Sequence, residues 1–115
     1  MKCYISFFII IFLSLFFVSC NVCTNEIIKS ENIDKENRIV LFSRDAGATT
    51  SSSLQISIIG INKQLENSKG NICITNGQYL DYKIDNDCIT IFYTGELFLK
   101  KEAFKNYLIA YVKEE

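Results

Sequence analysis

The residues with the clearest chemical potential lie in a run of glycine, hydroxyl and charged side chains between two apolar segments. They are Arg44, Asp45, Gly47, Thr49 and Thr50. Gly47 can adopt backbone angles closed to other residues, and successive amides beside Thr49 and Thr50 could form a concavity that holds an anion. Hydroxyl side chains also bond their own backbone in turns. The run is therefore predicted either to contact a ligand or partner or simply to connect two strands.

The absence of histidine from the sequence excludes much enzyme chemistry. Without histidine there is no Ser-His or Cys-His nucleophile pair and no histidine metal site. Asp81, Asp85 and Asp87 suggest calcium, but an EF-hand loop needs a glycine at its sixth position and a glutamate at its twelfth, which are missing here. We therefore expect no catalytic residue, no metal and no cofactor. An enzyme would have to use Asp45 or another carboxylate.

The charges of the chain are nearly balanced and are spread without blocks. Lysine and arginine number 12 against 13 aspartates and glutamates, a net charge of −1. Binding to nucleic-acid phosphates needs concentrated lysine and arginine. A nucleic-acid partner is therefore not expected.

The start of the chain has the pattern of a secretory signal. Lys2 precedes a run from Ile5 to Val18 that is apolar except for two serines. This run is shorter than the about 20 apolar residues that a membrane-spanning helix needs. We predict that residues 1–19 form a signal peptide, with an uncleaved anchor helix as the competing interpretation.

The sequence Phe17-Val18-Ser19-Cys20 resembles a bacterial lipobox. This resemblance implies an exported protein whose Cys20 carries diacylglycerol and an acyl chain such as palmitate, held on the cell membrane or outer membrane. Two lipid signals give stable anchoring. Phe17 departs from the leucine usual at its position, so a plain signal-peptidase cut near Ser19 is the competing interpretation.

Residues 20–37 are polar and mixed in charge, with few large apolar side chains. We predict that they form a lipidated tether in front of a small β-rich domain over residues 38–115. A short helix over residues 26–35, capped by Asn25, is the alternative, although isolated helices of this length are marginal.

The domain is predicted to be mainly β, because its apolar residues come in short β-branched or aromatic runs bounded by turn formers. In residues 54–58 strict alternation places Leu54, Ile56 and Ile58 on a core face and directs Gln55 and Ser57 towards water. The expected architecture is one antiparallel, meander-like sheet of five or six short strands, with a small open barrel as a variant. The strands are expected at residues 38–43, 54–58, 72–74, 79–84, 88–93 and 107–112.

The end of the domain has two interpretations. Residues 96–106 contain good helix formers and are predicted to form a turn or two of helix, whereas residues 107–112 have the composition of a strand. A single C-terminal helix is the alternative, since short apolar runs separate the two states poorly.

Three thiols remain if Cys20 is lipidated: Cys23, Cys73 and Cys88. In a meander the strand over residues 79–84 would lie between Cys73 and Cys88, so their Cα atoms would be about 9.6 Å apart or more. Disulfides rarely exceed about 7 Å between Cα atoms. We predict no bridge between Cys73 and Cys88, and we expect Cys23 to react most readily.

The run from Arg44 to Ile58 resembles a family of small, exported bacterial proteins classed as a domain of unknown function. The resemblance rests on Arg44-Asp45, Gly47-Ala48-Thr49-Thr50 and Gln55-Ile56-Ser57-Ile58, with weaker support from Gly70-Asn71-Ile72 and residues 85–93. Ala46 stands where the family usually has a cysteine. The resemblance implies a β-rich fold and export and adds no reaction.

These features predict a non-enzymatic, lipid-tethered binding or envelope-associated module. Its expected partners are the membrane, through the lipid on Cys20, and an envelope protein. The alternative is an inhibitor or immunity-type protein that blocks a partner enzyme at the cell surface. An enzyme ranks third, because no nucleophile and base pair is evident.

Overall fold

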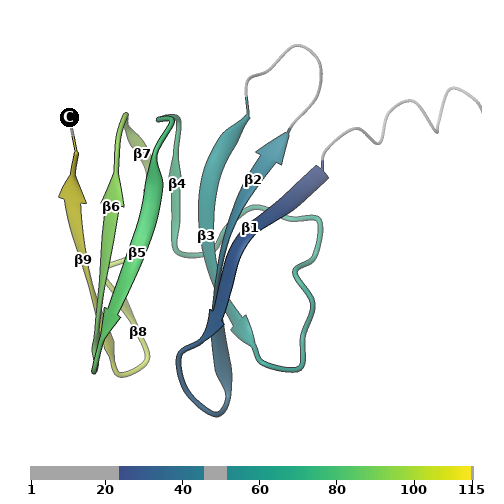
Figure 1. The fold of residues 1–115 in the computed structure, drawn as a ribbon, viewed down its shortest axis with the longest axis vertical. Coiled ribbons are helices and arrows are strands. Elements are labelled where there is room, and N and C mark those ends of the chain that lie inside the picture. Colours follow the sequence, from purple (N-terminus) through teal and green to yellow (C-terminus); the bar gives the residue numbers. More distant parts are fainter. Residues whose placement is uncertain (1–23, 46–51, 115) are drawn as a thin grey trace, which may run out of the picture.

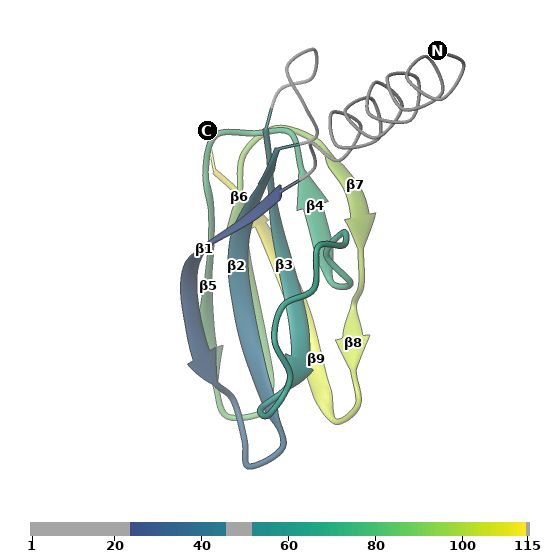
Figure 2. The same ribbon diagram turned by 90° about the vertical axis from the view of Figure 1, so that its right-hand side faces the viewer.

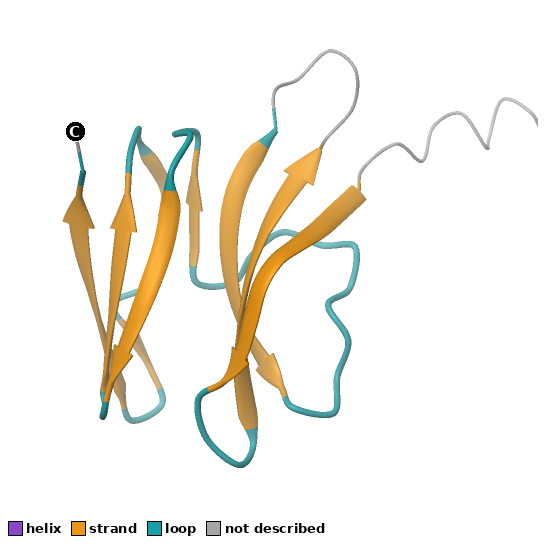
Figure 3. Ribbon diagram, viewed as in Figure 1, coloured by secondary structure: helices purple, strands orange, loops and turns teal. Residues whose placement is uncertain are grey.

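The computed structural model of the chain describes residues 24–45 and 52–114, and these residues form strands and loops without a helix (Figures 1 and 3). No helix within these two ranges is long and apolar enough to cross a membrane. The predicted mainly β class is confirmed. The strands are β1 (Thr24–Asn32), β2 (Asn37–Asp45), β3 (Ser53–Gly60), β4 (Cys73–Thr75), β5 (Leu80–Asp85), β6 (Cys88–Tyr93), β7 (Leu97–Lys100), β8 (Ala103–Phe104) and β9 (Tyr107–Lys113).

The prediction of a single meander-like sheet is wrong, because the strands form two sheets. One sheet has the order β1-β2-β3-β4-β7 and the other the order β5-β6-β9-β8. After β4 the chain leaves the first sheet and forms the hairpin of β5 and β6 in the second sheet. It then returns to the first sheet as β7 and crosses again to the second sheet at β8 (Figures 1 and 2). Neighbouring strands are antiparallel except β6 and β9, which are parallel.

The core lies between the two sheets. Alternate residues of each strand point inward, as the period of a pleated strand requires. The buried cluster contains Ile39, Leu41, Ile56, Ile58, Ile72 and Cys73 from the first sheet and its loop, and Leu80, Tyr82, Ile89, Ile91 and Ile109 from the second.

A second buried layer covers the outer face of β2 and β3. Residues 61–72 cross this face on the way to β4 (Figure 2). Beneath them Phe42, Gln55 and Ser57 are buried, and Gln55 accepts a hydrogen bond from the Gly70 amide at 2.6 Å. The expectation that Gln55 and Ser57 face water is wrong, because alternation assigns side chains to a face and does not reveal which loop covers it.

The predicted tether is wrong over Thr24–Asn32, and so is its helical alternative, because these residues form edge strand β1 paired with β2. The folded domain therefore includes Thr24–Asn32 and is not limited to the residues from Arg38 onwards. Lys29 connects β1 to β5 of the second sheet. Its ammonium group lies 3.2 Å from the Asp81 carboxylate and 4.3 Å from the Tyr82 ring centroid. A polar sequence fits this position, because charged side chains protect an exposed sheet edge from further pairing.

At the C-terminal end the strand over residues 107–112 is confirmed as β9, whereas the helical turn over residues 96–106 is replaced by β7 and β8. The other predicted strands are confirmed as β2 to β6. Residues 1–23 lie outside the described residues, and with them the predicted signal peptide and Cys20.

Candidate functional site

Arg44 and Asp45, two of the predicted contact residues, stand at the end of β2. Gly47, Thr49 and Thr50 lie outside the described residues. The Arg44 guanidinium donates hydrogen bonds to the side-chain oxygens of Asn25 at 2.9 Å and Asn67 at 3.0 Å. Asn25 is directly opposite Arg44 on β1. Arg44 therefore connects β1, β2 and the loop over residues 61–72, whereas Asp45 is exposed.

The arrangement around Arg44 holds the loop against the sheet. The amide nitrogen of Asn25 donates to the backbone carbonyls of Glu66 at 3.0 Å and Ser68 at 2.8 Å. These bonds satisfy backbone groups of a segment that has no strand partner, as buried or packed loops require. The contacts of the Arg44 side chain are therefore structural.

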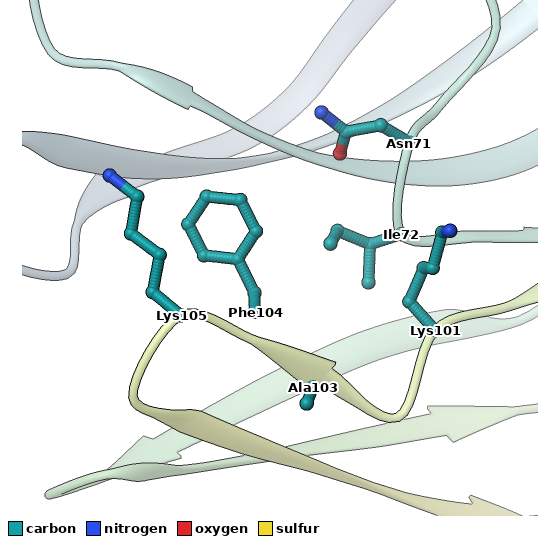
Figure 4. A pocket seen from close by; sticks show the side chains of 6 residues that line it. All are labelled: Asn71, Ile72, Lys101, Ala103, Phe104 and Lys105. Atoms are coloured by element: carbon teal, nitrogen blue, oxygen red, sulfur yellow. The ribbon is translucent and has the colours of Figure 1, made fainter.

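The strongest candidate site is a depression at the open side of the sandwich, where β8 approaches the start of β4. It has a volume of about 370 Å³ and is lined by Asn71, Ile72, Lys101, Ala103, Phe104 and Lys105 (Figure 4). Phe104 and Ile72 lie between the side chains of Lys101 and Lys105 in this view. The depression thus has an apolar floor with an ammonium group at each end.

The walls of the depression are fixed by backbone contacts. The Lys101 amide donates to the Ile72 carbonyl at 2.9 Å. The Asn71 side chain accepts a hydrogen bond from the Ile58 amide and donates one to the Ile58 carbonyl, both at 2.9 Å. Asn71 therefore shapes the wall, and the lysines are the groups available to a ligand.

The charge of this depression is entirely positive. No carboxylate is among its six lining residues. Neither Lys101 nor Lys105 forms an ion pair with another described residue. An anionic group that enters would find an ammonium donor at either end and no carboxylate in the lining, and hydrogen bonds between charged groups are stronger than neutral ones.

Two other depressions lack this character. One, beneath the loop over residues 61–72, is lined by Lys63 and Lys69 but also by Glu66. The other, at the opposite end of the sandwich, has no charged residue in its lining, which runs from Ser52 to Leu54 and from Asn76 to Gln78. Of these three depressions, the first alone has a lining with positive charge and no carboxylate.

Lys105 occupies an unfavourable backbone conformation beside the depression. Its φ is +52°, in the turn between β8 and β9, and among the described non-glycine residues it shares a positive φ only with Asn86, at +54°. Asparagine tolerates this region, whereas for lysine a left-handed conformation costs roughly 1–2 kcal/mol. Such local strain concentrates at functional sites. A lysine where glycine would fit better agrees with a role for its ammonium group.

The sequence does not indicate this site, although a helix would also have placed Lys101, Phe104 and Lys105 on one face. The depression is completed by Asn71 and Ile72, which lie far away along the chain. In the structure the same residues line one depression because the chain turns from β7 into the short strand β8. Lysines flanking an aromatic residue were the available signal.

Metal ligands do not gather in the described residues, which contain no cluster of three or more cysteine, aspartate or glutamate side chains suited to a metal. Asp85 and Asp87 instead flank Asn86 in the hairpin between β5 and β6, which joins the strands predicted at residues 79–84 and 88–93.

The thiols of Cys73 and Cys88 are free and lie in different sheets, on β4 and β6. Burial raises the pKa of the Cys73 thiol to about 12, so its reactive thiolate is scarce near neutral pH. Cys88 is only half-buried. The third thiol, Cys23, lies outside the described residues.

We therefore expect alkylation of the folded protein at pH 8 to label Cys88 well before Cys73, as measured by mass spectrometry of the peptides. Full labelling of both in denaturant without reductant is the control. Equal labelling rates in the folded protein would contradict the burial of Cys73.

Comparison of the sequence with protein-family models gave no match, and neither did comparison of the chain with curated proteins or with solved structures. The resemblance of residues 44–58 to a family of exported bacterial proteins thus stays a prediction.

Proposed function

We propose that this protein is a non-enzymatic binding module that holds an anionic group of its ligand between Lys101 and Lys105. The observation that carries the proposal is a depression with two ammonium groups, an apolar floor and no carboxylate in its lining. The ligand class is a phosphate or carboxylate that bears an apolar portion, because Phe104 and Ile72 contribute the floor.

The expected affinity for a small anion is low. Both ammonium groups are exposed, and an exposed charge pair contributes only about 0.2–1 kcal/mol, so the expected Kd for a small anion lies above about 1 mM. An aromatic portion that packs on Phe104 adds about 0.5–1.5 kcal/mol. Phenyl phosphate should therefore bind about twofold to tenfold more tightly than inorganic phosphate.

Removing both charges tests the proposal. In the double variant Lys101→Gln, Lys105→Gln, we expect the Kd for phenyl phosphate, followed by NMR titration, to rise at least about tenfold, a loss of about 1.4 kcal/mol. The matched control is Lys63→Gln, Lys69→Gln, which removes the same charge from the depression that contains Glu66. Equal weakening in both variants would mean that net charge alone attracts the anion.

We further propose that the module is exported and anchored to a membrane through lipid on Cys20. The support is the apolar start of the chain and the lipobox-like Phe17-Val18-Ser19-Cys20. In cells fed labelled palmitate, Cys20→Ser should abolish incorporation of the label, and the protein should be either released from the membrane or left unprocessed. The control variant Cys23→Ser should incorporate as much label as the parent. Equal labelling of the parent and Cys20→Ser would disprove attachment at this cysteine.

A second candidate function is an inhibitor or immunity-type protein that covers a partner enzyme. It is supported by the outer face of the second sheet, where Leu108 and Val112 on β9 are 69% and 42% exposed. Their partners in register on β6 are Cys88 and Phe92. The measurement is crosslinking of the protein to an envelope protein in cells. If Leu108→Lys abolishes the crosslink and the double variant Lys101→Gln, Lys105→Gln does not, this function is favoured over anion binding.

A further inference from the structure

The strands of the sandwich all run between the same two ends. The register of the first sheet aligns Thr24 with Asp45, Arg44 with Ser53, Leu54 with Thr75 and Thr75 with Leu97. Hydrogen bonds of Thr94 to Thr75 and Tyr79 join this end to the same end of the second sheet. We call it the proximal end, made up of Thr24, Asp45, Ser53, residues 75–80, residues 93–97 and Lys113.

The opposite, distal end carries the turn from β1 to β2 and the turn that contains Lys105. The two turns are neighbours, because the Tyr107 hydroxyl donates to the Asp34 carboxylate at 2.9 Å. The anion-binding depression therefore opens near the end that is far from Thr24.

Only three residues separate Cys20 from Thr24, where β1 begins. Four residue steps of about 3.3–3.6 Å each reach at most roughly 14 Å. A lipid on Cys20 therefore keeps Thr24, at the proximal end, within roughly 14 Å of the bilayer surface. A tether ending at residue 37 would have allowed a separation of tens of ångströms.

Two exposed aromatic side chains lie at or beside this proximal end. Tyr79 is 46% exposed, and Phe98, one residue beyond Leu97, is 65% exposed. Phe98 has no partner in register, because Leu97 pairs with Thr75 and Leu99 with Ile74. Such an extra residue bends a strand and redirects its side chain. Aromatic side chains are favoured at the level of lipid headgroups, where an apolar ring meets a polar surface.

The charges of the proximal end indicate which lipid it fits. Asp45, Glu96 and Glu114 are exposed carboxylates there, and the cations at this end are Arg44 and Lys113. Negative charge is repelled by anionic headgroups over about a Debye length. A zwitterionic surface suits this end better than an anionic one.

We infer that the proximal end docks on the membrane that holds the lipid anchor, with Tyr79 and Phe98 at headgroup level and the depression directed away from the bilayer. This inference rests on the proposed lipidation of Cys20. It assigns the two ends different tasks, since one end meets lipid and the other remains open to the ligand.

Single-tryptophan reporters can test this orientation, because the sequence contains no tryptophan. Tyr79→Trp and Phe98→Trp probe the proximal end, and Lys35→Trp, in the exposed turn before β2, probes the distal end. Each full-length, lipidated variant is reconstituted into phosphatidylcholine vesicles that contain brominated acyl chains. We expect loss of most emission from the two proximal reporters and almost none from the distal one. Equal quenching of all three, or stronger quenching at residue 35, would overturn the inference.

Vesicle flotation separates failure of docking from failure of anchoring. Protein that floats with vesicles while both proximal reporters stay bright retains its anchor and refutes docking. Protein that does not float refutes the lipid anchor and the docking together. Raising the phosphatidylglycerol content should weaken quenching at residues 79 and 98, and an increase would contradict the charge argument.

Discussion

Gly77→Ala is expected to lower the free energy of unfolding by about 3 kcal/mol or more, at the upper end of overpacking effects. A Cβ on Gly77 would overlap the backbone carbonyl and the hydroxyl of Thr94. The carbonyl is a backbone group at a crossing of the chain between the sheets, and Thr75 holds it there. Its hydroxyl donates to the Thr94 carbonyl at 2.6 Å and accepts from the Gly77 amide at 3.0 Å.

Gly60→Ala is the matched control for this substitution. A Cβ on Gly60 would meet its nearest atom, in the Lys63 side chain, at 3.5 Å, an ordinary contact. We expect a change within about 1 kcal/mol, as for most surface positions. Urea unfolding measures both variants, and a Gly77→Ala protein as stable as Gly60→Ala would contradict the close crossing of the sheets.

Phe42→Ala is expected to cost about 3–5 kcal/mol of stability, because it removes a fully buried aromatic ring and leaves a cavity. Phe42 is 0% exposed and is the largest fully buried side chain in the described part of the chain. Its partner in register is Gln55, which the loop over residues 61–72 covers. The size of the effect therefore reports whether this loop completes a second core layer.

Phe98→Ala is the control, since the same ring is removed from a position that is 65% exposed. We expect it to cost less than about 1 kcal/mol, because most of the ring already contacts water. Unfolding in urea by circular dichroism compares the two. Similar costs for both variants would show that the loop does not seal the outer face of β2 and β3.

The strands of this fold could be predicted from composition, and their partners could not. Alternation at residues 54–58 and turn formers at residues 85–87 indicate β3 and the hairpin of β5 and β6 correctly. The division into two sheets depends on the chain crossing after Thr75, returning after Tyr93 and crossing again after Lys100, and no local pattern marks a crossing. Parallel pairing of β6 with β9 is equally non-local.

Edge strands and loop-covered faces escaped prediction for a related reason. β1 is exposed along nearly its whole length, so hydrophobic periodicity, the main signal of a strand, is absent. Gln55 and Ser57 read as solvent-facing because polar residues usually are. Their burial depends on hydrogen bonds from Gly70 and Asn71, residues far along the chain.

The sequence indicates the kind of protein but not the residues that form the candidate site. The sequence indicates a module without a histidine-based active site and singles out Arg44 as a contact, whereas the structure gives Arg44 structural partners on β1 and in the loop. The depression with Lys101 and Lys105 forms because β8 turns towards Ile72, a contact between the two sheets. Pairings of this kind appear only with the tertiary structure.

The most direct test of anion binding at the depression compares Lys105→Gly with Asn86→Gly in urea unfolding, with and without phenyl phosphate. Both substitutions relieve a positive φ, so neither should lower stability without ligand. At a phenyl phosphate concentration tenfold above the Kd, the bound ligand raises the free energy of unfolding by about 1.4 kcal/mol. A general salt effect would raise it equally in the parent and in both variants. We predict this gain for the parent and Asn86→Gly and less than about half of it for Lys105→Gly. An equal gain in Lys105→Gly would contradict a role for this lysine in the site.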